Sequence, residues 1–368
     1  MNKEIFELEQ IVAPLLEWYD HHARILPWRE EPTAYHVWIS EIMLQQTRVE
    51  AVKPYYERFL RVFPDVKTLS EANEELLLKT WEGLGYYNRV RNLHKAAQMI
   101  MNEYAGEIPD TYEELLRLPG IGSYTAGAVS SIAFGRSVSA VDGNVLRIVA
   151  RVRMDDEDIL DAKVKKRIET ELNQIMPEER PGDFNQAMME LGAMICIPNG
   201  EAKCQECPWH CFCQAKKYDR IQEFPKKKKK KARVIEEKTI LVIQDAEKAA
   251  LRKRPSKGLL AGMYEFPWLE GNKTSDEVLA YLKEAGFQVI HIKELEHSKH
   301  IFTHKEWHMV GYAVRVDELE PNKLLEQDSS LLFLEPENTE QNYPIPTAFS
   351  AYTKYLKIRI GNDKYAEP

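Results

Sequence analysis

The chain has 368 residues, of which 44% are hydrophobic and 29% are charged, and its formal net charge is −8. This length fits two globular domains, and the acidic balance excludes indiscriminate binding to nucleic acid, so any DNA contact is expected to be local. The sequence contains no run of eighteen apolar residues and opens without a signal-peptide pattern, so we expect a cytosolic protein without membrane partners.

From Ile5 to about Lys217, apolar residues recur at helical spacing. Ile39, Ile42 and Met43 are an example, and Pro, Gly and Asn interrupt the pattern between helices. The first domain, which we place at residues 1–217, is therefore predicted to be all-α.

A glycine turn and a positioned carboxylate occur close together in this domain. Gly120 and Gly122 lie in the motif Leu-Pro-Gly-Ile-Gly at 118–122, before a helix of small residues. Such a turn brings backbone N–H groups close to a ligand, and the positive helix N-terminus favours phosphate. Asp142 opens the next helical run in an Asp-Gly turn, where an exposed carboxylate can be held at a fixed angle. A phosphate clamp beside a positioned acid predicts chemistry on nucleic acid.

All five cysteines lie within residues 196–213, so they cannot form disulfide bonds between distant parts of the chain. Clustering of this kind in a cytosolic protein indicates metal or cluster ligation. Four thiolates can hold zinc or an iron–sulfur cluster, and one distant cysteine followed by three crowded ones favours iron–sulfur. The four-thiolate set is Cys196, Cys204, Cys207 and Cys213; Cys211 leaves open an alternative in which it converges with Cys204 and Cys207.

The pattern changes after a lysine-rich linker at 218–233, whose like charges repel and cannot build a core. Short β-like runs at 239–243, 288–292 and 309–314 accompany one helical stretch at 276–285. We therefore expect an α+β second domain at 234–360, followed by a frayed tail at 361–368.

The turn, the aspartate and the cysteine loop together resemble the helix-hairpin-helix DNA glycosylases with a 4Fe-4S cluster, the endonuclease III superfamily. The resemblance covers the first domain and implies that Asp142 is catalytic and that the four-cysteine set holds a 4Fe-4S cluster. The family's loop has six residues in its first gap, whereas seven lie between Cys196 and Cys204 here.

The residue at the position of Tyr124 distinguishes two types of reaction within that superfamily. Bifunctional members have a lysine there, which attacks the sugar through a Schiff base, and a phenol cannot form an imine. Tyr124 resembles the tyrosine of adenine DNA glycosylases, the MutY family, which are monofunctional and remove adenine opposite 8-oxoguanine. Glu41 matches the general acid of this family, and its apolar neighbours Trp38 and Ile42 would keep it protonated near neutral pH.

The same resemblance implies a role for each further site residue. Glu41 would protonate adenine at N7, Asp142 would stabilise or trap the sugar cation, and Tyr124 and Asn144 would orient Asp142 and water. Residues expected to line the adenine pocket, fill the gap left by the flipped base or contact the 8-oxoguanine side are Arg29, Gln186, Leu44, Gln46, Thr47 and Tyr86.

The second domain resembles the Nudix-like C-terminal domain of these enzymes, on the stretch 258–267. Residues 276–286 lack the glutamates that hold magnesium in Nudix hydrolases, so a binding module is expected. The family's Phe-Ser-His loop, which reads 8-oxoguanine, is here Phe302, Thr303 and His304. We therefore expect a monomeric, nucleoid-associated bacterial-type protein whose partner is double-stranded DNA containing adenine opposite 8-oxoguanine.

Three alternatives remain at this point. A bifunctional pyrimidine-damage glycosylase and lyase shares the hairpin, the aspartate and the cluster, but Tyr124, Glu41 and the second domain oppose it. A thymine glycosylase acting on T·G mispairs shares the tyrosine but is not expected to carry the second domain. A non-catalytic iron–sulfur scaffold would not need both Glu41 and Asp142.

Overall fold

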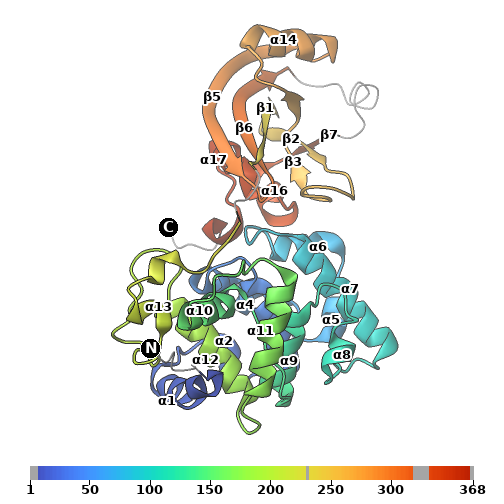
Figure 1. Ribbon diagram of the computed structural model, residues 1–368. Coiled ribbons are helices and arrows are strands. Elements are labelled where there is room, and N and C mark those ends of the chain that lie inside the picture. The colour runs from blue at the N-terminus through green and yellow to red at the C-terminus, as the bar shows by residue number, and fades with distance from the viewer. Residues whose placement is uncertain (1–6, 229–231, 318–330, 365–368) are drawn as a thin grey trace. The chain divides into compact units, whose positions relative to one another are not determined.

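The computed structural model describes residues 7–228, 232–317 and 331–364, which form two compact units (Figure 1). The first unit comprises Met1–Glu71 and Asn92–Lys230, and the second comprises Ala72–Arg91 and Lys231–Pro368. The sequence pattern places residues 72–91 in the first domain, but their contacts group them with the second unit. Periodicity alone does not reveal this, because it reports local structure rather than long-range contacts.

The first unit is helical, as predicted. Its helices are α1 (Val12–His22), α2 (Pro27–Glu30), α3 (Ala34–Leu44), α4 (Val49–Val62), α5 (Val66–Ser70), α7 (Asn88–Glu103, whose first turn belongs to the second unit), α8 (Tyr112–Leu115), α9 (Ser123–Phe134), α10 (Gly143–Arg153), α11 (Ala162–Gln174), α12 (Pro181–Met194) and α13 (Gln214–Lys217), with 3₁₀ turns at Leu8–Ile11 and Ile221–Glu223.

Helices α1, α10 and α12 share one hydrophobic core. Leu15, Val149 and Leu191, one from each helix, are all completely buried in it. Burying such side chains contributes about 1.5–3 kcal/mol each, which fixes these helices firmly relative to one another. The core therefore sets the positions of the first residues of α10 and of the facing side of α12.

The second unit is built on a seven-stranded mixed sheet with path order β3-β2-β1-β6-β5, in which β4 pairs with β1 and β7 with β2. β1 and β6 are parallel, and the other pairs are antiparallel. The strands are β1 (Val234–Asp245), β2 (Lys248–Lys253), β3 (Tyr264–Glu265), β4 (Trp268–Glu270), β5 (Val289–Ile301), β6 (Lys305–Val316) and β7 (Leu331–Leu334).

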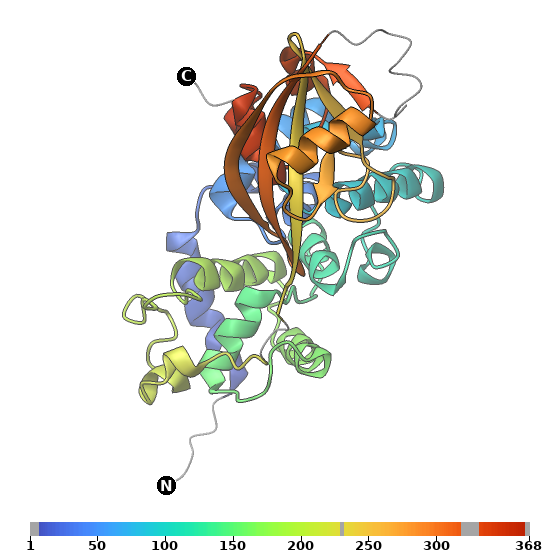
Figure 2. The same ribbon diagram turned by 90° about the horizontal axis from the view of Figure 1, so that it is seen from above.

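Helices cover both faces of this sheet, since alternate side chains of a strand point to opposite faces. Ile240 and Val242 pack with the 3₁₀ turn η3 (Thr347–Phe349) and helix α17 (Ser350–Tyr355), whereas Leu241 and Ile243 pack with α14 (Ser275–Glu284). Figure 2 shows α14 lying across the strands. The predicted α+β class of the second domain is confirmed.

One expectation about the tail needs adjustment, and the structure describes only part of the linker. Residues 361–368 are expected to fray, yet Gly361–Lys364 form the 3₁₀ turn η4, because the ammonium of Lys364 donates to the carbonyl oxygen of Glu340 at 2.9 Å; 365–368 lie outside the described residues. In the linker, Lys226 pairs with Asp158 in an isolated β-bridge, and 229–231 also fall outside the described part. Within the described ranges, no helix has both the length and the apolar character needed to cross a membrane.

Candidate active site

A cavity of about 560 Å³ lies in the first unit, between the N-terminal ends of α9 and α10 and the helices α2, α3 and α12. It collects predicted residues from segments that are far apart in the sequence. Those in its lining are Arg29, Glu41, Leu44, Gln46, Thr47, Gly122, Tyr124, Asp142, Asn144 and Gln186. Gly120 and the cysteines do not line it, and Tyr86 and residues 302–304 belong to the second unit.

Glu41 is a buried carboxyl group on α3, with only 5% of its surface exposed. The Tyr124 hydroxyl donates a hydrogen bond to Glu41 Oε2. Burial raises the pKa of Glu41 to about 7; the Tyr124 bond opposes this rise and the nearby Asp142 charge adds to it. At neutral pH this group therefore exchanges a proton readily.

Asp142 is the N-cap of α10, as its Asp-Gly turn predicts. Its carboxylate accepts from the backbone N–H groups of Asn144 and Val145 and from Asn144 Nδ2, all at 2.8 Å. The side chain is half-buried rather than exposed as expected, because it faces into the cavity. Burial raises its pKa and the three hydrogen bonds oppose that rise by favouring the carboxylate, while the Asp142 charge in turn raises the pKa of Glu41.

The side-chain amide of Asn144 is itself held by a hydrogen bond from Arg147. Its Oδ1 accepts from Arg147 Nη2 at 2.9 Å, and the same nitrogen donates to the carbonyl oxygen of Gly192 at 2.7 Å. A Cβ at position 192 would lie 2.6 Å from that of Asn144, so α12 can approach α10 here only through a glycine. This packing fixes the amide that orients Asp142.

Arg29 and Gln186 meet on one wall of the cavity, where Arg29 Nε donates to Gln186 Oε1 at 2.8 Å. Behind them lies the buried Glu190, which accepts two bonds of 2.7 Å from Arg24 and one of 3.0 Å from Arg29. Burial by itself would raise the pKa of Glu190, but the two arginines hold it below its usual range. Sequence reasoning missed Glu190 and Arg24, because a helical Glu and a lone Arg resemble ordinary surface residues.

Asn185 is a second residue that the sequence did not reveal. Its buried amide donates to Ser131 Oγ and the Val138 carbonyl, both at 2.8 Å, and accepts from the Ala140 N–H at 2.9 Å. It thereby fixes the segment that leads into Asp142. Its position beside Gln186 in the sequence was the only available signal.

The glycine turn has the backbone expected of it. Gly120 has a φ of +79°, which favours glycine, and a Cβ there would lie 2.6 Å from Asn92 Cβ. Gly122 is the N-cap of α9 and is open to solvent, with nothing within 4 Å of where a Cβ would lie. The turn therefore presents the uncapped N-terminus of a twelve-residue helix to a ligand.

Two predicted gap-filling residues have left-handed backbones, Gln46 with a φ of +60° and Tyr86 with +49°. Such conformations are costly for non-glycine residues and concentrate at functional sites. Both side chains are exposed, and Tyr86 shows 51% of its surface to solvent. Leu44 and Thr47, beside Gln46, are half-buried.

The cysteine loop brings four thiols together and leaves the fifth outside. Cys196, Cys204, Cys207 and Cys213 are half-buried and act electrostatically on one another, whereas Cys211 is exposed. Burial is the main cause that raises the pKa of Cys207 to about 12 and that of Cys213 to about 11. The buried Arg151 donates to Cys196 Sγ at 3.3 Å and would stabilise a negative sulfur there.

This donor set therefore fits an iron–sulfur cluster held by four thiolates. In the part of the chain that the structure describes, no three His, Cys, Asp or Glu side chains converge closely enough to hold one metal ion.

Residues 302–304 form the turn between β5 and β6 in the second unit. The Phe302 ring packs edge-on against His300 and Trp307, with centroids 4.6 and 4.8 Å apart, so it anchors the turn. Thr303 and His304 are exposed at the tip. In α14, Glu277 serves as a cap, since its carboxylate accepts from Thr274 N at 2.8 Å.

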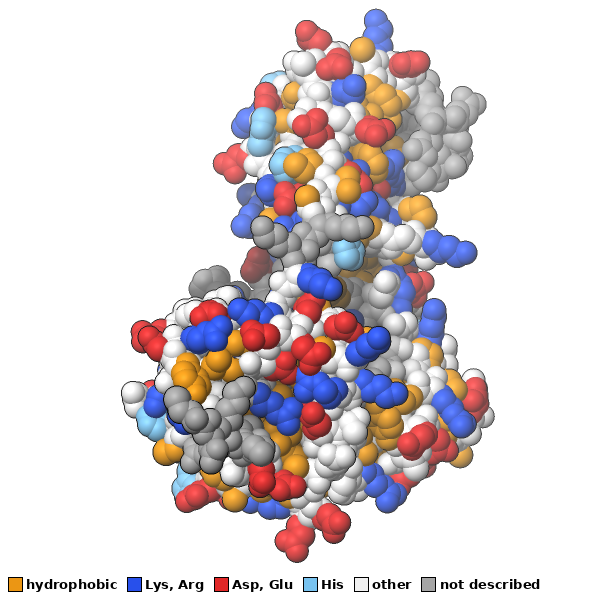
Figure 3. All heavy atoms as spheres, viewed as in Figure 1, with side chains coloured by type: hydrophobic (Ala, Val, Ile, Leu, Met, Phe, Trp, Pro, Cys, Tyr) orange, Lys and Arg blue, Asp and Glu red, His pale blue; other side chains and the backbone are white. Residues whose placement is uncertain are grey.

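Charge on the face drawn in Figure 3 is mixed, with Lys and Arg side chains interspersed among Asp and Glu. Charged side chains of the first unit also pair with one another; Arg180, for example, contacts Asp20 at 2.5 Å and Asp183 at 2.7 Å.

Two family models match successive stretches of the chain. Residues 39–177 match the model of the HhH-GPD superfamily of base excision DNA repair proteins, and 239–355 match that of the NUDIX domain. Adenine DNA glycosylase of Buchnera aphidicola subsp. Acyrthosiphon pisum is 35% identical over 86% of this chain and 88% of its own length. The Arabidopsis thaliana adenine DNA glycosylase is also 35% identical, over 81% of this chain, which spans 56% of that relative. A thermostable thymine-DNA glycosylase structure aligns with a TM-score of 0.53 and 26% identity, covering 57% of this chain and 97% of its own.

Proposed function

This chain belongs to the adenine DNA glycosylase family, and from that premise we propose that it hydrolyses the N-glycosidic bond of adenine mispaired with 8-oxoguanine or guanine. The substrate is duplex DNA, and the product is an abasic site that initiates base excision repair. We therefore expect the protein to act on chromosomal DNA.

The observation that carries this proposal is the pair of carboxyl groups in one cavity. Glu41 is buried with a pKa of about 7, while Asp142 is stabilised as a carboxylate by three hydrogen bonds. A proton donor and an anion side by side are what an oxocarbenium-like transition state requires.

Adenine must leave the base stack before it can enter this cavity, which costs a few kcal/mol and less for a mispair. Gln46 and Tyr86, exposed on strained backbones, would fill the gap, with Leu44 beside Gln46. Arg29 and Gln186 would contact the flipped adenine from the cavity wall.

Bond cleavage then uses both carboxyl groups. Glu41 gives its proton to adenine N7 as the electron pair of the glycosidic bond moves to the base, which leaves as neutral adenine. Asp142 stabilises the cationic sugar or bonds to C1′. Water then adds to C1′, displacing the Asp142 carboxylate where that bond has formed, and gives its proton to the Glu41 carboxylate, which restores the acid. Tyr124 and Asn144 hold the two carboxyl groups in place through the bonds described above.

DNA would be held by both units. Gly120 and Gly122 would present backbone N–H groups to a phosphate in the first unit. Thr47, which lines the cavity, would contact the DNA on the side of the duplex that carries 8-oxoguanine. In the second unit, Phe302 would anchor the turn while Thr303 and His304 read the 8-oxoguanine.

A 4Fe-4S cluster held by Cys196, Cys204, Cys207 and Cys213 would order the loop 196–213 without taking part in the reaction. Removing one ligand should lower the iron content, whereas Cys211 should be dispensable. We expect Cys204→Ser to lose most bound iron and Cys211→Ser to keep it, as measured by iron analysis of the purified proteins. Loss of iron from Cys211→Ser alone would overturn this ligand set.

Single-turnover adenine release from duplexes carrying A opposite 8-oxoguanine, G, C or T tests the whole proposal. We expect the fastest release opposite 8-oxoguanine, and no borohydride-trapped adduct, since Tyr124 cannot form an imine. A T·G duplex serves as the control for a thymine glycosylase. Release of thymine there, with adenine retained everywhere, would contradict the proposal.

A further inference from the structure

Residues 72–91 match the glycosylase family model but belong to the second unit. They contain helix α6 (Glu74–Thr80) and the Tyr86 loop, which we define as residues 83–87. The loop carries Tyr86 in its left-handed conformation. One side of this segment thus bonds to the C-terminal part of the chain, and the other carries a residue proposed to enter DNA.

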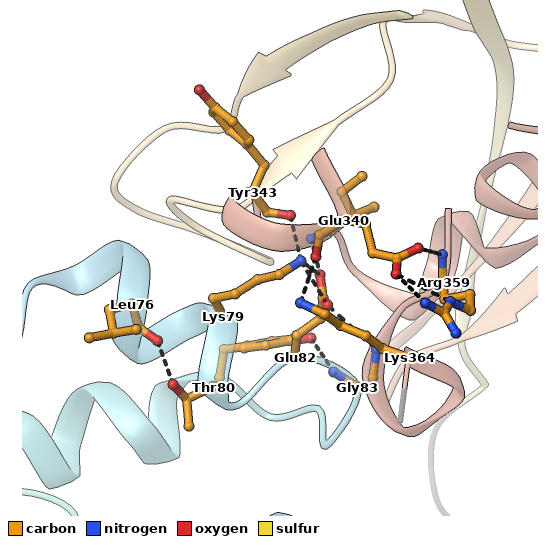
Figure 4. Close-up of polar contacts among 12 residues, drawn as sticks. Leu76, Lys79, Thr80, Glu82, Gly83, Glu340, Tyr343, Arg359 and Lys364 are labelled. Carbon is orange, nitrogen blue, oxygen red and sulfur yellow. Dashed lines mark hydrogen bonds and ion pairs between the residues drawn. The ribbon is translucent and has the colours of Figure 1, made fainter. Parts of the chain in front are cut away.

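The main attachment is a buried ion pair at the end of α6 (Figure 4). Lys79 Nζ contacts both oxygens of Glu82 at 3.0 Å and donates to the carbonyl oxygen of Tyr343 at 3.0 Å. Glu82, 3% exposed, also accepts from the backbone N–H of Ile345 at 2.7 Å and from that of Gly361 at 3.5 Å. These two side chains therefore join α6 to three separate backbone points of the C-terminal region.

A second attachment lies at the start of α6. Glu75 accepts from Lys253 Nζ at 2.7 Å and from the Tyr264 hydroxyl at 2.8 Å. Arg91 donates to Glu74 at 2.8 Å and also to the carbonyl oxygen of Ala261. Both ends of the segment are thus fixed to the sheet unit, but these contacts are more exposed than the Lys79–Glu82 pair.

The Tyr86 loop is tied in turn to the end of α6. Trp81 directly precedes Glu82, and its Nε1 donates to the carbonyl oxygen of Gly85 at 3.0 Å. Arg89 donates to the same oxygen at 3.0 Å, and its guanidinium lies 5.4 Å from the centre of the Tyr86 ring. A shift of Glu82 would move Trp81 and with it the backbone that presents Tyr86.

We propose that Lys79 and Glu82 are positioning residues through which the C-terminal sheet unit fixes the Tyr86 loop for insertion into DNA. This inference rests on the proposed function, because it gives the C-terminal unit a second task besides reading the opposite base. A change at the ion pair acts on adenine release through Tyr86 alone.

A double-mutant cycle between Glu82→Gln and Tyr86→Ser tests this coupling. We expect Glu82→Gln to slow single-turnover adenine release opposite 8-oxoguanine about tenfold, and the double variant to match Tyr86→Ser within about twofold. Rate effects that multiply would overturn the proposal. Lys79→Met with Glu82→Gln removes both charges together and guards against unfolding caused by one unpaired buried charge. Lys273→Met, which breaks an exposed ion pair with Glu277 of α14 in the same unit, is the matched control.

Hydrogen–deuterium exchange of the intact protein gives a readout that does not depend on activity. Amides 84–89 should exchange at least about tenfold faster in the variant that combines Lys79→Met with Glu82→Gln than in the wild type or Lys273→Met, while the amides of β1 and β6 keep their protection. Unchanged protection there would overturn the coupling. If the wild type released no adenine from any duplex, the proposed function would fail, while the exchange result would still decide whether the ion pair holds the loop.

Discussion

The cavity of the first unit and the 302–304 turn of the second place their side chains in different environments. Glu41, Asn185 and Glu190 are buried and hydrogen-bonded, so each side chain is fixed by partners from distant segments. The side chains of Thr303 and His304 lie exposed at a turn, whereas the Phe302 ring packs against Trp307. Bond cleavage needs shifted pKa values and fixed angles, whereas reading a base needs an accessible surface. Substitutions should therefore cost far more in the cavity than in the turn.

The sharpest test of this contrast is Asp142→Asn. The amide keeps the size of the side chain but cannot stabilise a sugar cation, so adenine release should fall by about 10⁴-fold. Binding to a duplex with A opposite 8-oxoguanine should remain, as measured by mobility shift. Asp161→Asn changes another helix N-cap, at the start of α11, and should have little effect. Near-normal turnover in Asp142→Asn would refute the mechanism.

Glu41→Gln removes the proton donor and should slow release by about 10²- to 10³-fold. In the wild type, Glu41 is protonated below its pKa of about 7, so the rate should be high below that pH and fall as pH rises through it. At lower pH the rate should fall again as Asp142, whose pKa is also raised, becomes protonated. Single-turnover rates measured across pH give both sides of this profile, and the fall at higher pH, its upper limb, should vanish in Glu41→Gln.

Tyr124→Phe should have an intermediate effect. Its hydroxyl donates to Glu41 and lowers the pKa of that group, so its removal should shift the upper pH limb to higher pH. Losing a bond to a charged group costs about 1.5–3 kcal/mol, so the maximal rate should drop about tenfold or more. A limb that moved to lower pH would show that the hydroxyl does not stabilise the Glu41 carboxylate.

Much of the fold could be predicted because it depends on local signals. Helical periodicity, the Asp-Gly turn at Asp142 and the strand runs of the second domain are each encoded within a few residues. Resemblance to a family then named Glu41 and Tyr124, which the structure places in hydrogen-bond contact. Their catalytic roles stay predictions, which the substitutions above test.

What could not be predicted depends on contacts between distant segments. Glu190 is an ordinary helical glutamate until Arg24, 166 positions away, is seen to donate to it. Similarly, Glu82 is 263 positions from Ile345, and nothing near either residue indicates that they meet. Long-range pairing of buried charges leaves no periodic trace in the sequence.

The turn at 302–304 should give the smallest effects. Thr303→Ser restores the residue typical of the family and keeps the hydroxyl, so the preference for 8-oxoguanine over G opposite A should change by less than about twofold. Thr303→Ala removes the hydroxyl, and one exposed hydrogen bond of about 1 kcal/mol predicts a loss of about fivefold in that preference. The ratio of single-turnover rates on the two duplexes measures both variants. Because Thr303 is exposed and has no buried partner to leave unsatisfied, neither change should alter the rate opposite G. If Thr303→Ala left the preference unchanged, His304 or another part of the second unit would recognise the 8-oxoguanine instead. A larger loss would mean that DNA binding fixes the side chains of this turn as firmly as those of the cavity are fixed.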